Sequence, residues 1–170
     1  MKTIAEGEFT DVDYHEDVLY ATLNENNRTI IACRNLNTLK LIKTLETPCR
    51  SSYRLDSIRV NGKYLVLGCW TNDEVYLLNL GDSNATFDKI SDTNERRFYG
   101  PNVVAIDTED NVIVADFAHH RIQMYQEGTW QTLQLVPQPR YPTAAVYIND
   151  TLYVSGLRSD SFYISMYAIE

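Results

Sequence analysis

The segment from Pro101 to Tyr125, PNVVAIDTEDNVIVADFAHHRIQMY, constrains the fold of this chain more than any other part of the sequence. It contains three short runs rich in β-branched and aromatic residues, and polar turns separate these runs. Such runs are typical of β-strands joined by tight connections. Because degraded copies of the same pattern recur along the chain, the sequence predicts one structural unit repeated several times.

The copies align on a short apolar run that occurs four times. The runs are Val18-Leu19-Tyr20-Ala21, Tyr64-Leu65-Val66-Leu67, Val112-Ile113-Val114-Ala115 and Leu152-Tyr153-Val154-Ser155. Their spacing is roughly forty-odd residues, which is the range of a four-stranded propeller blade. The sequence therefore predicts an all-β protein, a single β-propeller domain over residues 1–170, with blades at about 8–47, 53–93, 101–136 and 142–170.

The last repeat stops after its third strand, whereas the chain begins with a strand that belongs to no repeat. This spare strand covers residues 2–5, and Lys2-Thr3-Ile4 resembles the outer strands of the other repeats. We expect the N-terminus to supply the outer strand of the last blade, because ring closure removes an exposed strand edge. The alternative is an open fragment, for which a second copy of the chain would complete the ring.

Charge and cysteine content narrow the functional classes. The net charge is −8 and the pI about 4.8, which disfavours nucleic acid as a partner. We find no apolar run long enough for a membrane span and no secretory signal at the start, so we expect no membrane association and a cytoplasmic location. Cys33, Cys49 and Cys69 match no zinc spacing and are expected to be reduced thiols, although Cys33 and Cys49 could pair in an oxidising setting.

Most arginines fall in loops that a propeller would place on one face. These are Arg28, Arg121 and Arg158 in hairpins between second and third strands, and Arg50, Arg54, Arg96, Arg97 and Arg140 in connections between blades. The opposite loops are acidic and contain Glu16, Asp17, Asp82, Glu109, Asp110, Glu127 and Asp150, against Lys63 alone. We therefore expect a disc with an arginine face and an acidic face.

Aromatic residues accompany these arginines, and together they form our candidate partner-binding set. The set is Arg54, Trp70, Arg96, Arg97, Tyr99, Phe117, His119, Arg121, Arg140, Tyr141 and Arg158. Arginine beside exposed rings is the composition of protein-binding hot spots and of surfaces that stack bases. The alternative is structural, since each arginine could instead pair with an aspartate nearby in a turn, such as Asp56, Asp73, Asp116 or Asp160.

The segment GPNVVAIDTEDNVIVADFAHHRIQMY resembles an NHL repeat. Pro101, Asp107, Val114-Ala115-Asp116 and His120-Arg121-Ile122 match the family pattern, and His119 stands where asparagine is usual. The resemblance implies a binding module, as in tripartite-motif ubiquitin ligases and Brain-tumor-type regulators, in which the corresponding face binds RNA or protein. It also implies six blades, whereas this chain has material for four. Within such a repeat, Asp116 and His120 are expected to brace the turn between them.

Catalytic chemistry has little support in the sequence. Related six-bladed propellers include lactonases and lyases with a metal in the central channel, and the equivalent channel positions here are Thr10, Asp56, Asn102 and Ala144. Two oxygen ligands make a poor site for a hard cation, and no nucleophile motif or glycine-rich phosphate loop is present. We expect no catalytic residue, no metal and no cofactor.

These observations predict a non-enzymatic recognition module whose partner is a protein or peptide with an acidic or mixed surface. Single-stranded RNA is the second candidate partner, and self-association is expected if the ring is incomplete. The alternative from another class is a hydrolase or lyase centred on the channel.

Overall fold

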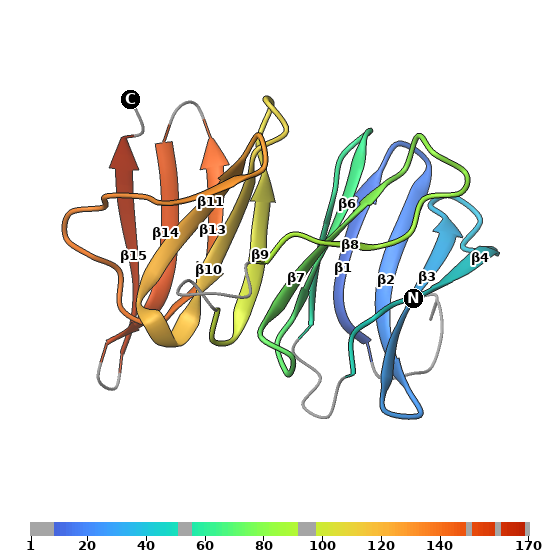
Figure 1. The fold of residues 1–170 in the computed structure, drawn as a ribbon, viewed down its shortest axis with the longest axis horizontal. Helices are drawn as coiled ribbons and strands as arrows, with labels where there is room; N and C mark the ends of the chain where they lie inside the picture. The colour runs from blue at the N-terminus through green and yellow to red at the C-terminus, as the bar shows by residue number, and fades with distance from the viewer. Residues whose placement is uncertain (1–8, 51–55, 92–97, 149–150, 159–160, 169–170) are drawn as a thin grey trace.

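The computed structural model describes residues 9–50, 56–91, 98–148, 151–158 and 161–168, apart from the side chain of Arg158. These residues form four antiparallel sheets in chain order, three of four strands and a last one of three (Figure 1). The strands of the first two sheets are β1 (Phe9–His15), β2 (Val18–Glu25), β3 (Arg28–Asn35), β4 (Leu41–Glu46), β5 (Ser57–Val60), β6 (Tyr64–Cys69), β7 (Glu74–Asn79) and β8 (Asp88–Lys89). Those of the last two are β9 (Pro101–Ile106), β10 (Val112–Asp116), β11 (Arg121–Gln126), β12 (Thr129–Thr132), β13 (Pro142–Ile148), β14 (Thr151–Arg158) and β15 (Ser161–Ala168), with a short 3₁₀ turn η1 (Phe117–His119) between β10 and β11.

The hairpins form where the sequence places residues that tolerate a left-handed backbone. Asn26 and Asn27 have φ values of 51° and 61°, and Glu127 and Gly128 have 47° and 83°. Two successive positive φ values are typical of the two-residue turns whose twist matches that of the flanking strands. These turns fix the registers of β2 with β3 and of β11 with β12. Each sheet is therefore a meander of the kind expected for a propeller blade, and the predicted fold class is confirmed.

The sheets stand side by side through their inner strands, in the order β1, β5, β9 and β13. Side chains of one inner strand bond the backbone of the next: Asp11 accepts the N–H of Ile58 at 3.1 Å, and Asp13 accepts that of Val60 at 2.7 Å. The first and last sheets lie at opposite ends of the molecule (Figure 1), and in the described residues β13 makes no comparable contact with β1.

The four blades therefore form an open arc, and the closed four-bladed ring expected from the sequence is not observed. The blade number agrees with the expectation, and the strands of the four sheets lie within residues 9–46, 57–89, 101–132 and 142–168. The strand expected at residues 2–5 lies outside the described residues, so its pairing with the last blade stays a prediction. No helix in the described ranges is long and apolar enough to cross a membrane.

Three apolar clusters fill the interfaces between successive blades. The first joins Ile31 and Cys33 to Leu65 and Leu67, and the second joins Val66 and Val75 to Val103, Val112 and Val114. The third joins Val104, Ile113, Ala115 and Ile122 to Leu152, Val154 and Tyr167. The core is thus distributed over the interfaces, and every interior sheet is apolar on both faces.

The clusters correct the alignment of the four repeats. In the third and fourth blades, Val112 and Leu152 face the preceding blade, whereas in the second blade Leu65 does so and Tyr64 packs against the following blade. The runs that begin at Val18 and Tyr64 are therefore one residue out of phase with the other two. The sequence did not reveal this slip, because the runs are apolar at nearly every position and a shift by one residue exchanges the two faces.

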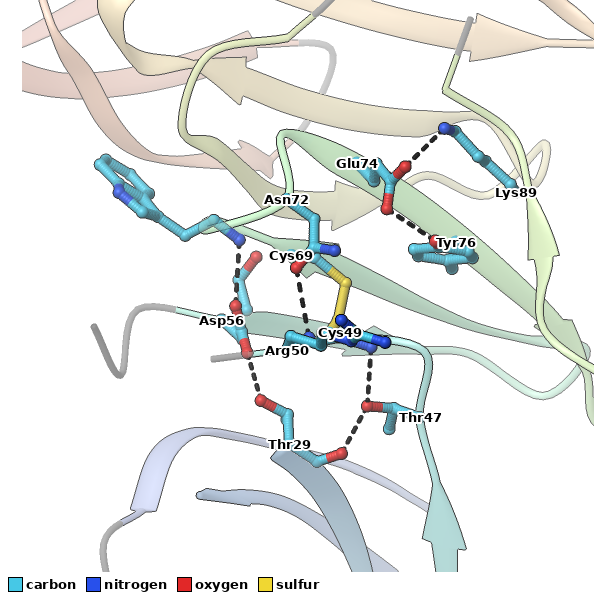
Figure 2. Close-up of a disulfide and its surroundings, with 12 residues drawn as sticks. Thr29, Thr47, Cys49, Arg50, Asp56, Cys69, Asn72, Glu74, Tyr76 and Lys89 are labelled. Atoms are coloured by element: carbon cyan, nitrogen blue, oxygen red, sulfur yellow. Dashed lines mark hydrogen bonds and ion pairs between the residues drawn. A yellow bond between two sulfur atoms is a disulfide. The ribbon is translucent and has the colours of Figure 1, made fainter. Parts of the chain in front are cut away.

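A disulfide joins Cys49, in the connection after β4, to Cys69 at the end of β6 (Figure 2). The two Cα atoms are 5.4 Å apart, and both side chains are buried in the first interface cluster. The expectation of reduced thiols is therefore wrong for these two residues, and Cys33 is not the partner of Cys49. Cys33 is a free, buried thiol in the same cluster, where burial raises its pKa. Sequence spacing could not identify the pair, because the bond crosses between two blades.

Candidate aromatic binding face

Three aromatic rings lie in a row on the side of the arc that carries the turns between second and third strands, and the middle ring contacts the other two. Trp70 follows β6, Phe117 follows β10 and Tyr141 precedes β13. The ring centroids of Trp70 and Phe117 are 5.2 Å apart, and those of Phe117 and Tyr141 are 5.1 Å apart. We call these three residues the aromatic row, and this side of the arc is the lower one in Figure 1.

Further side chains extend the aromatic row on both sides. Tyr99 is exposed and its ring lies 6.3 Å from that of His119, while the ring of His120 packs edge-on against Tyr141 at 4.1 Å. A cavity of about 280 Å³ opens beside the row. It is lined by Trp70, Thr71, Asp73, Tyr99, Gly100, Phe117 and Ala118. The face therefore combines large rings with one small recess.

Buried carboxylates hold the backbone of this face in place. Asp116 is fully buried, and it accepts hydrogen bonds from the Tyr99 N–H at 2.9 Å and from Arg121 Nε at 2.7 Å. His119 Nδ1 lies 3.0 Å from the same carboxylate. Asp56 does the same for the second blade, because it accepts the N–H of Trp70 at 3.0 Å. These hydrogen bonds fix the backbone at Tyr99 and Trp70.

The close approach of two connections explains the glycine in this face. Gly100 has a φ of 67°, and its N–H donates to Asp73 at 2.9 Å. A Cβ atom at this position would lie 2.8 Å from Cζ2 of Trp70, which is closer than carbon atoms normally approach. Glycine is therefore required both by the left-handed backbone and by the indole ring that covers it.

The structure brings together five of the predicted site residues. Trp70, Tyr99, Phe117, His119 and Tyr141 form one continuous surface. Arg121 is held by Asp116, as in the structural alternative considered above, and Arg140 is exposed next to Tyr141 in sequence. Arg54, Arg96, Arg97 and the side chain of Arg158 lie outside the described residues. The binding roles of all these residues stay predictions.

Sequence reasoning missed His120 and misassigned the brace of the η1 turn. His120 adopts a left-handed conformation with a φ of 58°, and its Nδ1 accepts the N–H of Tyr141 at 3.1 Å. His119, rather than His120, approaches Asp116. The two histidines are adjacent, so only the backbone conformation of the turn decides which one faces the carboxylate. The signal that was available is the doublet itself, one turn away from an aspartate.

The loops on the opposite side of the arc, which join first to second and third to fourth strands, are acidic, as expected. Glu16, Asp17, Asp82, Glu109 and Glu127 are exposed in its loops, while Asp150 lies outside the described residues. Lys63 Nζ contacts Asp110 Oδ2 at 2.8 Å, and the hydrogen bond from Lys63 lowers the pKa of this carboxyl group.

The channel positions do not assemble a ligand set. Asp56 is buried, and its carboxylate also accepts the hydroxyl of Thr29 across the interface of the first two blades (Figure 2). Asn102 Nδ2 donates to the backbone carbonyl of Thr143 at 2.5 Å. Across the described ranges, we find no cluster of three His, Cys, Asp or Glu side chains that could hold a metal ion.

The third blade contains the segment that matches a known repeat family. Residues 98–125 match the family model of the NHL repeat. Over this segment the third blade is similar to an NHL repeat. The matched segment includes Tyr99, Gly100, Asp116, Phe117 and Arg121, so the NHL repeat supplies the centre of the aromatic face. The resemblance inferred from the sequence is confirmed.

Solved structures agree with the propeller fold, although a search of curated proteins gives no match. The chain is similar to a catalytically inactive virginiamycin B lyase from Staphylococcus aureus with quinupristin, with a TM-score of 0.66, 12% identity and coverage of 96% of this chain and 56% of that one. A chain of the nidogen/laminin complex gives 0.64 with 15% identity and coverage of 88% and 57%, and the Cps50 (Swd1) β-propeller domain of Myceliophteria thermophila gives 0.62 with 12% identity and coverage of 95% and 54%. The chain thus spans little more than half the length of these propellers.

Proposed function

We propose that this chain is a non-enzymatic recognition module that binds a peptide or protein partner through the aromatic row and its recess. The observation that carries the proposal is the contact between rings of three successive blades beside an open cavity. Tryptophan and tyrosine are enriched among the residues that dominate binding energies at protein interfaces. A partner that contacts all three rings spans three blades, so the site requires several repeats and could not be formed by one.

The size and support of the site favour a peptide side chain as the anchored group. A volume of about 280 Å³ lies at the lower limit of small-molecule pockets and accommodates one large side chain. Because Asp116 and Asp56 already fix the backbone at Tyr99 and Trp70, binding requires little ordering of this face. Pre-organisation of this kind reduces the entropic cost of association.

Single-stranded RNA is the second candidate, because rows of exposed rings can stack bases. Two observations weigh against it. The net charge of the chain is −8, and Arg121, which the sequence placed on this face, is held by Asp116. RNA binding would draw mainly on cationic side chains, and its affinity would fall steeply with salt.

An enzymatic role has less support in the side chains. The similarity to a lyase has 12% identity and therefore concerns the fold. Asp56, the candidate ligand at the channel, has its carboxylate engaged by Thr29 and Trp70.

A cytoplasmic location stays a prediction, and the Cys49–Cys69 disulfide argues against it, because such bonds are rare in reducing compartments.

The proposal predicts that alanine at Tyr99 or Tyr141 weakens peptide binding by about 10-fold or more for each ring. Both rings are exposed, so these substitutions should leave the fold intact. Peptides would be selected from a displayed random library on the immobilised chain, and their affinities would be measured by calorimetry. Val136→Ala is the control, because it truncates an exposed apolar side chain that belongs neither to the row nor to its recess.

Two results would contradict this proposal. One is a set of selected peptides whose affinity is the same for Tyr99→Ala, Tyr141→Ala and the parent chain. The other is a failure to select peptides together with tight binding of a short single-stranded RNA pool whose affinity falls steeply between low and physiological salt. The second result would assign the face to RNA.

A further inference from the structure

The first and the last sheet of the arc each expose one face, and these two faces are of the kind that pack together between successive blades. We call the face of a sheet that packs on the preceding blade its leading face, and the face that packs on the following blade its trailing face. Each of the three interior interfaces joins a trailing face to a leading face. Among the described residues, the leading face of the first sheet and the trailing face of the fourth sheet are left without such a partner (Figure 1).

The trailing face of the fourth sheet is apolar and open to solvent. Phe162, Ile164 and Met166 of β15 are 81%, 75% and 69% exposed. Val146 lies opposite Tyr153, which lies opposite Met166, so the apolar surface continues across all three strands. On the other side of the same sheet, Leu152 and Val154 are fully buried against the third blade.

A sheet that keeps one face in water normally alternates apolar and polar side chains along each strand. The fourth sheet instead carries large apolar side chains on both faces, as the interior sheets do. Exposed apolar surface of this extent marks an interaction site. Because its pattern is that of an interior blade, the group it fits is another sheet face.

The leading face of the first sheet provides the complementary surface. Val12 and Tyr14 of β1 are 54% and 62% exposed, and Leu41 of β4 is also exposed. Tyr14 lies opposite Leu19 in β2, so the apolar side chains continue across neighbouring strands of this sheet as well. The trailing face of the same sheet is already covered by the second blade through Ile31 and Cys33.

We propose that two copies of this chain associate head to tail, so that the trailing face of the fourth sheet of each copy packs on the leading face of the first sheet of the other. A single copy cannot pair its own two faces, because they lie at opposite ends of the arc (Figure 1). The chain spans 54–57% of the length of the propellers reported above, so two copies together have about the length of one such propeller.

The blade count of the proposed assembly agrees with that of closed propellers. Two four-bladed arcs give a ring of about eight blades, which is within the range of four to eight that is typical of closed propellers. Both interfaces are then equivalent, and a twofold axis relates the two copies. A head-to-tail contact that closes in this way is limited to two copies and forms no fibre.

Analytical ultracentrifugation of the 170-residue chain tests the proposal. The expected mass is twice 19.6 kDa. Ile164→Lys on the trailing face and Val12→Lys on the leading face should each raise the dimer dissociation constant by about 100-fold or more, because each places an unpaired charge in an apolar interface. Tyr99→Lys is the matched control, since it changes an exposed aromatic side chain outside both faces and should leave the mass unchanged.

Mixing the two interface variants distinguishes head-to-tail pairing from any other contact. The Ile164→Lys chain keeps its leading face and the Val12→Lys chain keeps its trailing face, so the mixture should contain a heterodimer although each variant alone is monomeric. A parent chain that stays monomeric at about 100 µM, a mass that keeps growing with concentration, or a mixture without heterodimer would each overturn the proposal. Circular dichroism of each variant verifies that its fold is retained.

Discussion

Replacing Asp116 with alanine is expected to lower the free energy of unfolding by about 3 to 5 kcal/mol. The carboxylate is fully buried, and it accepts hydrogen bonds from the Tyr99 N–H and from Arg121 Nε. Its removal leaves the mostly buried Arg121 guanidinium without its charge partner and the Tyr99 N–H without an acceptor. Urea denaturation of the variant and the parent chain measures the difference.

Asp116→Asn provides the matched variant for this experiment. An amide retains the shape of the side chain and an oxygen that can accept the Tyr99 N–H, but it lacks the charge that Arg121 requires. The asparagine variant should therefore lose less stability than the alanine variant. Glu109→Ala, in an exposed turn, should change stability by less than about 0.5 kcal/mol. A loss below 1 kcal/mol for Asp116→Ala would show that the brace does not stabilise the third blade.

Removing the Cys49–Cys69 disulfide is expected to cost about 3 kcal/mol. The two cysteines are 20 residues apart in sequence, and a cross-link of that length restricts the unfolded chain by roughly this amount. For a chain of this size, the loss corresponds to a fall in melting temperature of about 6 to 12 °C. Differential scanning calorimetry of the Cys49→Ala/Cys69→Ala variant measures it.

Reductant supplies the control for the disulfide prediction. Dithiothreitol should lower the melting temperature of the parent chain toward that of the double variant and leave the double variant unchanged. Cys33→Ala should keep the response to reductant, because Cys33 is a free thiol outside the bond. A parent chain that is insensitive to reductant would contradict the role of the disulfide.

The sequence was most informative where one repeat carries both strand pattern and turn residues. In the third blade, the segment from Pro101 to Tyr125 predicted the strands and, from its family resemblance, the NHL repeat itself. The aromatic residues of the face were also predictable, because the order of strands in a propeller assigns each connection to one end. Trp70, Phe117 and Tyr141 are consequently neighbours in space although they are far apart in sequence.

Other features depended on contacts that the sequence does not contain. The aligned runs of the first two blades were one residue out of phase with those of the last two. An almost wholly apolar strand does not show which of its faces packs on the preceding blade. The open arc and the Cys49–Cys69 bond follow from how the blades stand relative to one another. His119 and His120 exchanged roles because the left-handed conformation of His120 directs the two side chains differently.

The most direct test of peptide recognition by the aromatic row uses the two tryptophans of the chain as ¹⁹F probes. Trp70 belongs to the row, whereas Trp130 is buried between the second and third blades, and its indole N–H donates to the Ile90 carbonyl at 2.6 Å. After labelling with 5-fluorotryptophan, Trp70→Phe and Trp130→Phe variants assign the two resonances. Titration with a selected peptide should shift the Trp70 resonance and leave that of Trp130 in place, whereas saturating binding that leaves the Trp70 resonance unmoved would contradict the account.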